Sequence, residues 1–147
     1  MSDLDKARTL LEAAERDLRA LRGMSDPTVF ADEIAGFHAQ QAAEKLLKSW
    51  LALLGESFPF THDIDYLLRL VEKHELGVER FEELIEYNPY AVQFRYESYD
   101  SDAEPIDREE AVRRLETLRQ QVWQWLAAEE MSRKTNDDGQ DRDPEFD

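Results

Sequence analysis

The fold follows from one segment, His38-Ala39-Gln40-Gln41-Ala42-Ala43-Glu44-Lys45-Leu46-Leu47-Lys48-Ser49-Trp50. In an α-helix each residue is rotated by about 100° from the one before it. The apolar side chains of this segment, together with two leucines that follow it, then fall on one broad face of the helix. That face consists of Ala39, Ala42, Ala43, Leu46, Leu47, Trp50, Leu53 and Leu54. Because the face is wide, the segment is predicted to be the central helix of a bundle, packed by more than one neighbour.

A line of polar side chains occupies the other side of this helix. The polar line consists of His38, Gln41, Glu44, Lys45 and Lys48. It is either a solvated face or a binding site, and the sequence leaves both interpretations open. Ile34 and Phe37 lie near this polar side, and a pair of apolar residues there indicates a second contact surface, such as a dimer interface.

The length and composition indicate one helical domain. The chain has 147 residues, with only 5 Gly and 5 Pro and no Cys, so disulfides, Cys-ligated zinc and thiol nucleophiles are excluded. The N-terminus lacks a basic region followed by an apolar one, and the longest apolar run, residues 50–54, is too short to span a membrane. We therefore expect a cytoplasmic protein with no membrane association.

The charge balance is strongly acidic. Lys and Arg number 18 against 34 Asp and Glu, which gives a formal net charge of −16 and a pI near 4.5. Such a surface repels the phosphate backbone of nucleic acids. General nucleic-acid binding is therefore disfavoured, although a local basic groove or a basic protein partner remains compatible with this charge.

Helical spacing recurs along most of the chain. It predicts helices over residues 4–22, 30–54 and about 61–76, and a last helix that starts after the capping box of Asp107 and Glu110 and ends near Glu130. Asn88-Pro89 divides residues 78–94 into two short helices or one kinked helix. The prediction is all-α, an up-and-down bundle of four to five helices over residues 1–131, followed by a disordered acidic tail, 132–147.

Few residues could carry chemistry. His74 is predicted to be a packed or boundary residue on the apolar side of its helix, His62 to cap a helix start, and His38 lies in the polar line. No paired His motif, Gly-rich phosphate loop or serine-hydrolase elbow is present, so no cofactor or metal is expected. Arg95 follows an aromatic cluster, where it could stack, pair with a nearby acid or hold a phosphate.

Four segments together resemble the HEPN domain, the "higher eukaryote and prokaryote nucleotide-binding" helical domain of small prokaryotic proteins. In family order they are Ala14-Glu15-Arg16-Asp17-Leu18, His38 to Lys48, Pro59-Phe60-Thr61-His62-Asp63-Ile64 and Phe94-Arg95-Tyr96. The resemblance implies a helical bundle that forms a homodimer. It also implies a protein partner, a small nucleotidyltransferase encoded beside it, often as a toxin–antitoxin pair.

The resemblance further implies a metal-independent ribonuclease in many relatives, with a motif of Arg followed after a few positions by His. Arg95 matches the Arg, but Asp100, Ser101 and Asp102 stand where the His would fall, and no His follows His74. A Tyr near this motif is modified by the partner in some systems. Tyr99 is near enough to be a candidate, without the family's His-x-Tyr setting.

Three hypotheses follow. The first is a non-catalytic, dimeric HEPN protein that binds a nucleotidyltransferase and also a nucleotide or other phosphate ligand. Its ligand-binding candidates are Arg95, His38, Gln41, Lys45, Lys48 and Tyr99. The second is a ribonuclease toxin in which Arg95 stabilises phosphate charge and His38 replaces the missing His. The third is a structural module without a ligand.

Overall fold

A computed structural model describes residues 3–91 and 104–140, with side chains up to residue 136. These residues form four α-helices and one 3₁₀ helix. In chain order the helices are α1 (Asp3–Arg22), α2 (Asp32–Leu53), α3 (Ile64–Glu72), η1 (Val78–Ala91) and α4 (Arg108–Gln140). The all-α prediction is confirmed, and no helix of the described part is long and apolar enough to cross a membrane.

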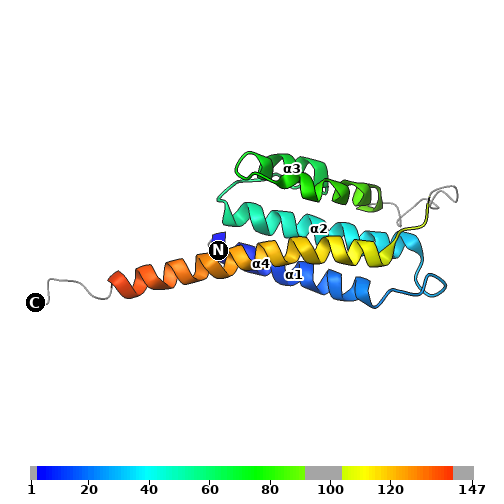
Figure 1. The fold of residues 1–147 in the computed structure, drawn as a ribbon, viewed down its shortest axis with the longest axis horizontal. Coiled ribbons are helices and arrows are strands. Elements are labelled where there is room, and N and C mark those ends of the chain that lie inside the picture. The colour runs from blue at the N-terminus through cyan, green and yellow to red at the C-terminus, as the bar shows by residue number, and fades with distance from the viewer. Residues whose placement is uncertain (1–2, 92–103, 141–147) are drawn as a thin grey trace, which may run out of the picture.

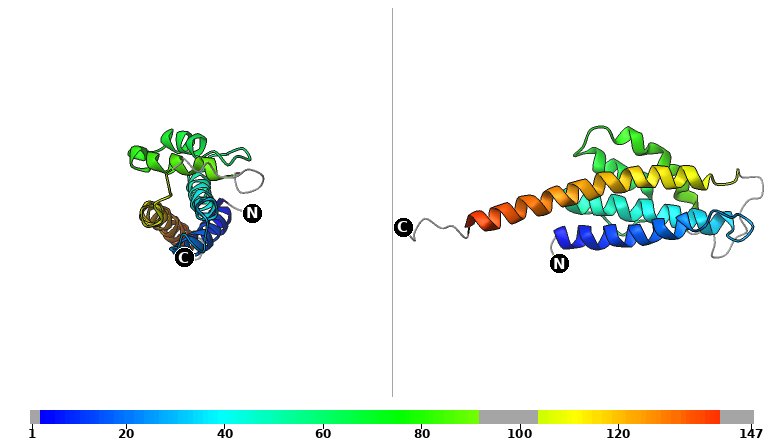
Figure 2. Two further views of the ribbon diagram at one scale, coloured as in Figure 1. Left: turned by 90° about the vertical axis from the view of Figure 1, so that its right-hand side faces the viewer. Right: turned by 60° about the horizontal axis from the view of Figure 1, so that its bottom comes forward.

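The helices pack side by side around α2 (Figures 1 and 2). Each of the other four helices contacts α2. Ion pairs such as Arg8–Glu130 and Arg119–Glu15 show that α1 and α4 are antiparallel. The chain runs in alternating directions through α1, α2, η1 and α4, and α3 pairs with η1 on one side of α2.

The core confirms the central position of α2. Its six residues from Ala39 to Trp50 on the predicted apolar face are all buried. The Trp50 indole packs edge-on against Phe81 of η1 and Trp125 of α4, with both ring centroids 5.8 Å away. One side chain of α2 therefore joins three helices, as the width of the apolar face predicts.

The start of α3 differs from the prediction. The helix begins at Ile64 and not near residue 61, because Asp63 is the N-cap and its side chain accepts hydrogen bonds from the backbone N–H groups of Asp65 and Tyr66. Asn88 accepts from the Ile64 N–H, with an N···O distance of 2.8 Å, and donates to Asp63. The helix ends at Glu72, earlier than expected, and η1 then continues through Pro89 without the predicted interruption.

The last helix also differs from the prediction. Asp107 caps α4 as expected, accepting a hydrogen bond from the Glu110 N–H. However, α4 does not end near Glu130 but continues to Gln140, so residues 132–140 are helical and not part of a disordered tail. This end carries few apolar residues, which is why hydrophobic periodicity misses it; residues 141–147 lie outside the described part of the chain.

Candidate functional site

Part of the polar line of α2 is bound to one carboxylate of α1. Asp17 accepts a hydrogen bond from Lys45 Nζ at 2.6 Å, and its other carboxylate oxygen lies 3.0 Å from His38 Nδ1. The Asp17 side chain is only 12% exposed. Asp17, His38 and Lys45, here the Asp17 cluster, therefore hold α1 against α2 by a largely buried, charge-assisted contact.

The rest of the polar line gathers around a second carboxylate, Glu44, which belongs to the line itself. Glu44 accepts hydrogen bonds from Lys48 Nζ at 3.1 Å and from Gln40 Nε2 at 3.1 Å, and it lies 2.7 Å from His62 Nδ1. Glu44 and Lys48 are almost completely buried. These four residues are called the Glu44 cluster, and Gln41 joins it by donating to the Gln40 side-chain oxygen.

Aromatic rings border the Glu44 cluster where it reaches the surface. Lys48 Nζ lies 5.9 Å from the centre of the Phe58 ring and 5.7 Å from that of Phe60. Lys6 of α1 lies over Phe58 at 4.5 Å, and the His62 ring meets Phe60 edge-on. Phe60 is 90% exposed, so a solvent-facing ring stands beside the Lys48 ammonium and the His62 imidazole.

All three histidines of the chain have a carboxylate partner. His38 pairs with Asp17, His62 with Glu44, and His74 Nε2 with Glu56 at 2.8 Å. His74 lies at the surface, so it is not packed into the core. Because a chain with 34 acids gives every His such a partner, a carboxylate–His pair here is weak evidence for catalysis.

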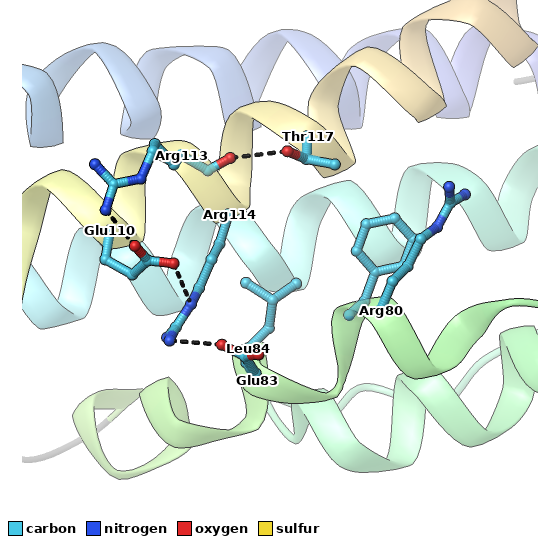
Figure 3. Close-up of a pocket in the computed structure, with 8 residues that line it drawn as sticks. Arg80, Glu83, Leu84, Glu110, Arg113, Arg114 and Thr117 are labelled. Carbon is cyan, nitrogen blue, oxygen red and sulfur yellow. Dashed lines mark hydrogen bonds and ion pairs between the residues drawn. The ribbon is translucent and has the colours of Figure 1, made fainter.

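A groove of about 300 Å³ lies between η1 and α4, and Figure 3 shows the side chains that line it. Arg114 is its central cation, and it pairs with Glu83, Glu86 and Glu110. The Arg80 guanidinium stacks over the Phe81 ring at 4.7 Å and donates to the Gln121 side chain. The cations of the groove are therefore already occupied by the protein's own groups.

Burial and those contacts shift the pKa values of three side chains in or beside this groove. Burial raises the pKa of Tyr87 to about 12, although the nearby Arg114 opposes the change. Burial lowers the pKa of Arg114, but its bonds with Glu86 and Tyr87 outweigh that effect and raise it overall. The hydrogen bond from Arg113 is the main reason that the pKa of Glu110 is lowered. The groove therefore holds paired charges of both signs near neutral pH.

The comparisons with known proteins identify the family. The family model of the HEPN domain matches residues 7–130, which is most of the chain. The chain belongs to the HEPN family. The searches of curated proteins and of solved structures gave no match.

The predicted site residues of this HEPN domain fall into two groups. His38, Gln41, Lys45 and Lys48 lie in the Asp17 and Glu44 clusters, none of them on an open, solvated face. Arg95 and Tyr99, like the positions expected for the motif His, lie outside the described residues. In the described part of the HEPN domain no group of three or more acidic or His side chains could hold a metal ion.

Sequence reasoning missed the partners of the polar line. Asp17 lies outside the apolar stripe of its helix and His62 at a helix start, yet each completes one of the two clusters. The available signal was the resemblance itself, since Asp17 and His62 both lie in segments that match the HEPN domain. Helical periodicity alone could not pair residues on different helices.

Proposed function

We propose that this HEPN protein is a non-catalytic binding protein that acts as a homodimer and as the HEPN half of a nucleotidyltransferase-linked, toxin–antitoxin type pair. The observation that carries the proposal is the incomplete ribonuclease motif. Arg95 is present, but two carboxylates and a hydroxyl, Asp100, Asp102 and Ser101, stand where the imidazole would be. Carboxylates there repel a scissile phosphate and supply no imidazole for proton transfer.

The contacts of the Asp17 cluster support a non-catalytic role, because its ammonium group is already neutralised. His38 is the only substitute that the polar line offers, and its Nδ1 and the neighbouring Lys45 are both bound to Asp17. An ammonium group that already has a carboxylate partner at 2.6 Å contributes little positive potential to an incoming phosphate. The polar line therefore favours helix packing over phosphodiester cleavage.

A nucleotide or another phosphate ligand remains part of the proposal. Its support is the surface of the Glu44 cluster, where the exposed Phe60 ring stands near Lys48 and His62. A base can stack on such a ring, and Lys6, whose ammonium lies over the neighbouring Phe58 ring, can meet its phosphate. Binding there requires no catalytic group.

The partnership can be tested by affinity purification. A tag on this chain, co-expressed with the nucleotidyltransferase encoded beside it, should retain that protein through washing. A tagged variant with Phe60→Ala should retain it equally, because Phe60 is assigned to the ligand and not to the partner. Loss of the nucleotidyltransferase from the unmodified chain would contradict the proposed partnership.

The ribonuclease alternative predicts a different result. Purified protein incubated with single-stranded RNA, without metal ions, should leave the RNA intact if the protein is non-catalytic. Cleavage that disappears in both Arg95→Ala and His38→Ala would establish the alternative, with Arg95 stabilising the phosphate and His38 transferring the proton. Cleavage that survives both changes would contradict the non-catalytic proposal and also remove these residues from the mechanism.

A further inference from the structure

The surface between α1 and α4 carries a local excess of positive charge. Two hollows of about 130 and 380 Å³ lie along it, and Arg22 lines both of them. They are lined by five arginines and three glutamates, whereas the whole chain has 18 basic and 34 acidic residues. The arginines are Arg19, Arg22, Arg108, Arg113 and Arg119. The two hollows, here the arginine groove, therefore have a lining in which the charge balance of the chain is reversed.

Two of these arginines serve the fold. Arg108 is almost completely buried and donates to two backbone carbonyl oxygens of the connection between α1 and α2. Arg119 pairs with Glu15 of α1 and with Glu116 of its own helix. These two side chains shape the walls of the arginine groove and hold α1 against α4, the neighbouring helices in Figure 2.

The other three arginines are open to a ligand. The Arg19 side chain is exposed and makes no ion pair with any residue in the described part of the chain. Arg22 and Arg113 are 50% and 63% exposed, and each pairs with one glutamate, Glu116 and Glu110 respectively. A guanidinium has five N–H donors, and exposed ion pairs add little stability. All three can therefore accept a further carboxylate as a partner.

The floor between these cations is apolar. Leu18 lines the smaller hollow, and Leu21 and Val112 line the larger one. The two leucines belong to the core, and Val112 is partly buried against it. Because arginines surround an apolar floor, the arginine groove matches a ligand that combines carboxylates with an apolar side chain.

We propose that the arginine groove binds an acidic segment of a protein partner. The carboxylates of that segment meet Arg19, Arg22 and Arg113, and one of its apolar side chains lies on Leu21 and Val112. This inference rests on the partnership in the proposed function, and it assigns the face of the bundle that the nucleotidyltransferase contacts.

The charges around the arginine groove favour a protein segment over a nucleic acid. The chain has a net charge of −16, and Glu15, Glu109 and Glu116 stand among the arginines. A nucleic acid carries a phosphate at every nucleotide, so these carboxylates oppose it along the whole groove. A short peptide segment can place two or three carboxylates at the open arginines and uncharged groups beside the glutamates.

Paired charge reversals test the arginine groove. One double variant combines Arg19→Glu with Arg22→Glu, and the matched control combines Lys73→Glu with Lys134→Glu, two exposed cations outside the groove. Both variants change the net charge by the same amount. Each tagged chain is co-expressed with the nucleotidyltransferase encoded beside it. The control should retain as much of that protein as the unmodified chain does, and the groove variant less than a tenth.

The possible results separate this inference from the proposed function. Retention by the groove variant at or above the level of the control would overturn the arginine groove as the contact face and leave the partnership standing. Failure of the unmodified chain to retain the nucleotidyltransferase would reject both. Single-stranded RNA that binds the unmodified chain but not the groove variant would assign the groove to nucleic acid and overturn the proposal.

A charge-conserving variant keeps the test independent of folding. Arg19→Lys combined with Arg22→Lys preserves the positive charge and supplies amines that a zero-length carbodiimide can join to carboxylates. Peptide mass spectrometry of the treated complex should find a link from position 19 or 22 to an Asp or Glu of the nucleotidyltransferase. A complex that forms without any such link would overturn the proposed contact, even if the charge-reversal variant proved unstable by circular dichroism.

Discussion

Glu44 is the residue whose placement changes the interpretation of the polar line most. Its carboxylate is buried and joins α2 to the segment before α3 through His62, and it holds the ammonium of Lys48 within α2. A buried charge is tolerated only when it is paired and hydrogen-bonded. Glu44 therefore positions the loop that carries the exposed Phe60.

Glu44→Gln should lower the free energy of unfolding by about 3 kcal/mol, because it leaves the buried Lys48 ammonium without its counter-charge. Urea unfolding monitored by circular dichroism measures this. Adding Lys48→Met to Glu44→Gln should recover much of the loss, since the buried charge is then gone. As a control, Glu83→Gln on the exposed surface should change stability by less than about 0.5 kcal/mol. An equal effect of the Glu44 and Glu83 substitutions would contradict the buried pair.

At the scale of elements, the contact between α2 and η1 depends on a glycine. The ring of Tyr90 lies so close to Gly36 that an added Cβ would be 2.3 Å from its Cδ1 atom. Tyr90 is itself only 5% exposed, so it cannot move aside freely. The end of η1 therefore sits against the first turns of α2 only because Gly36 has no side chain.

Gly36→Ala should therefore destabilise the protein by about 1–3 kcal/mol, the usual cost of overpacking, despite the better helix propensity of Ala. Gly23→Ala is the matched control, because a Cβ there meets no atom closer than 3.4 Å. Thermal unfolding of the two variants measures this difference in stability. A melting temperature for Gly36→Ala equal to that of Gly23→Ala would show that η1 does not pack on α2 in this way.

Sequence periodicity predicts those elements whose apolar residues face one core. It locates α1, α2 and α4 and the buried side of each, because their stripes are long and regular. It fails where contacts join distant residues: Lys45 and Asp17 are 28 positions apart, and His62 and Glu44 are 18 apart. It also missed the burial of Glu44 and Lys48, since α3, η1 and the loop before them are packed against a side of α2 that looks solvent-facing in isolation.

At the scale of the whole molecule, ion pairing limits what the surface can attract. Cations such as Arg69 and Arg114 each pair with several carboxylates, and the net charge is −16. A long phosphate polymer therefore meets a surface on which most of the described cations already have a carboxylate partner. The proposed function therefore assigns protein–protein association, and not binding of a nucleic-acid backbone, to this surface.

We propose that this HEPN protein works as a dimer bound to a nucleotidyltransferase, and the mass of the purified complex tests this most directly. The chain is co-expressed with the protein encoded beside it, and the mass of the purified species is determined by light scattering. We predict one complex that contains two copies of this chain together with the partner. Elution of this chain alone, with a mass of 17.2 kDa and no bound nucleotidyltransferase, would contradict the claim.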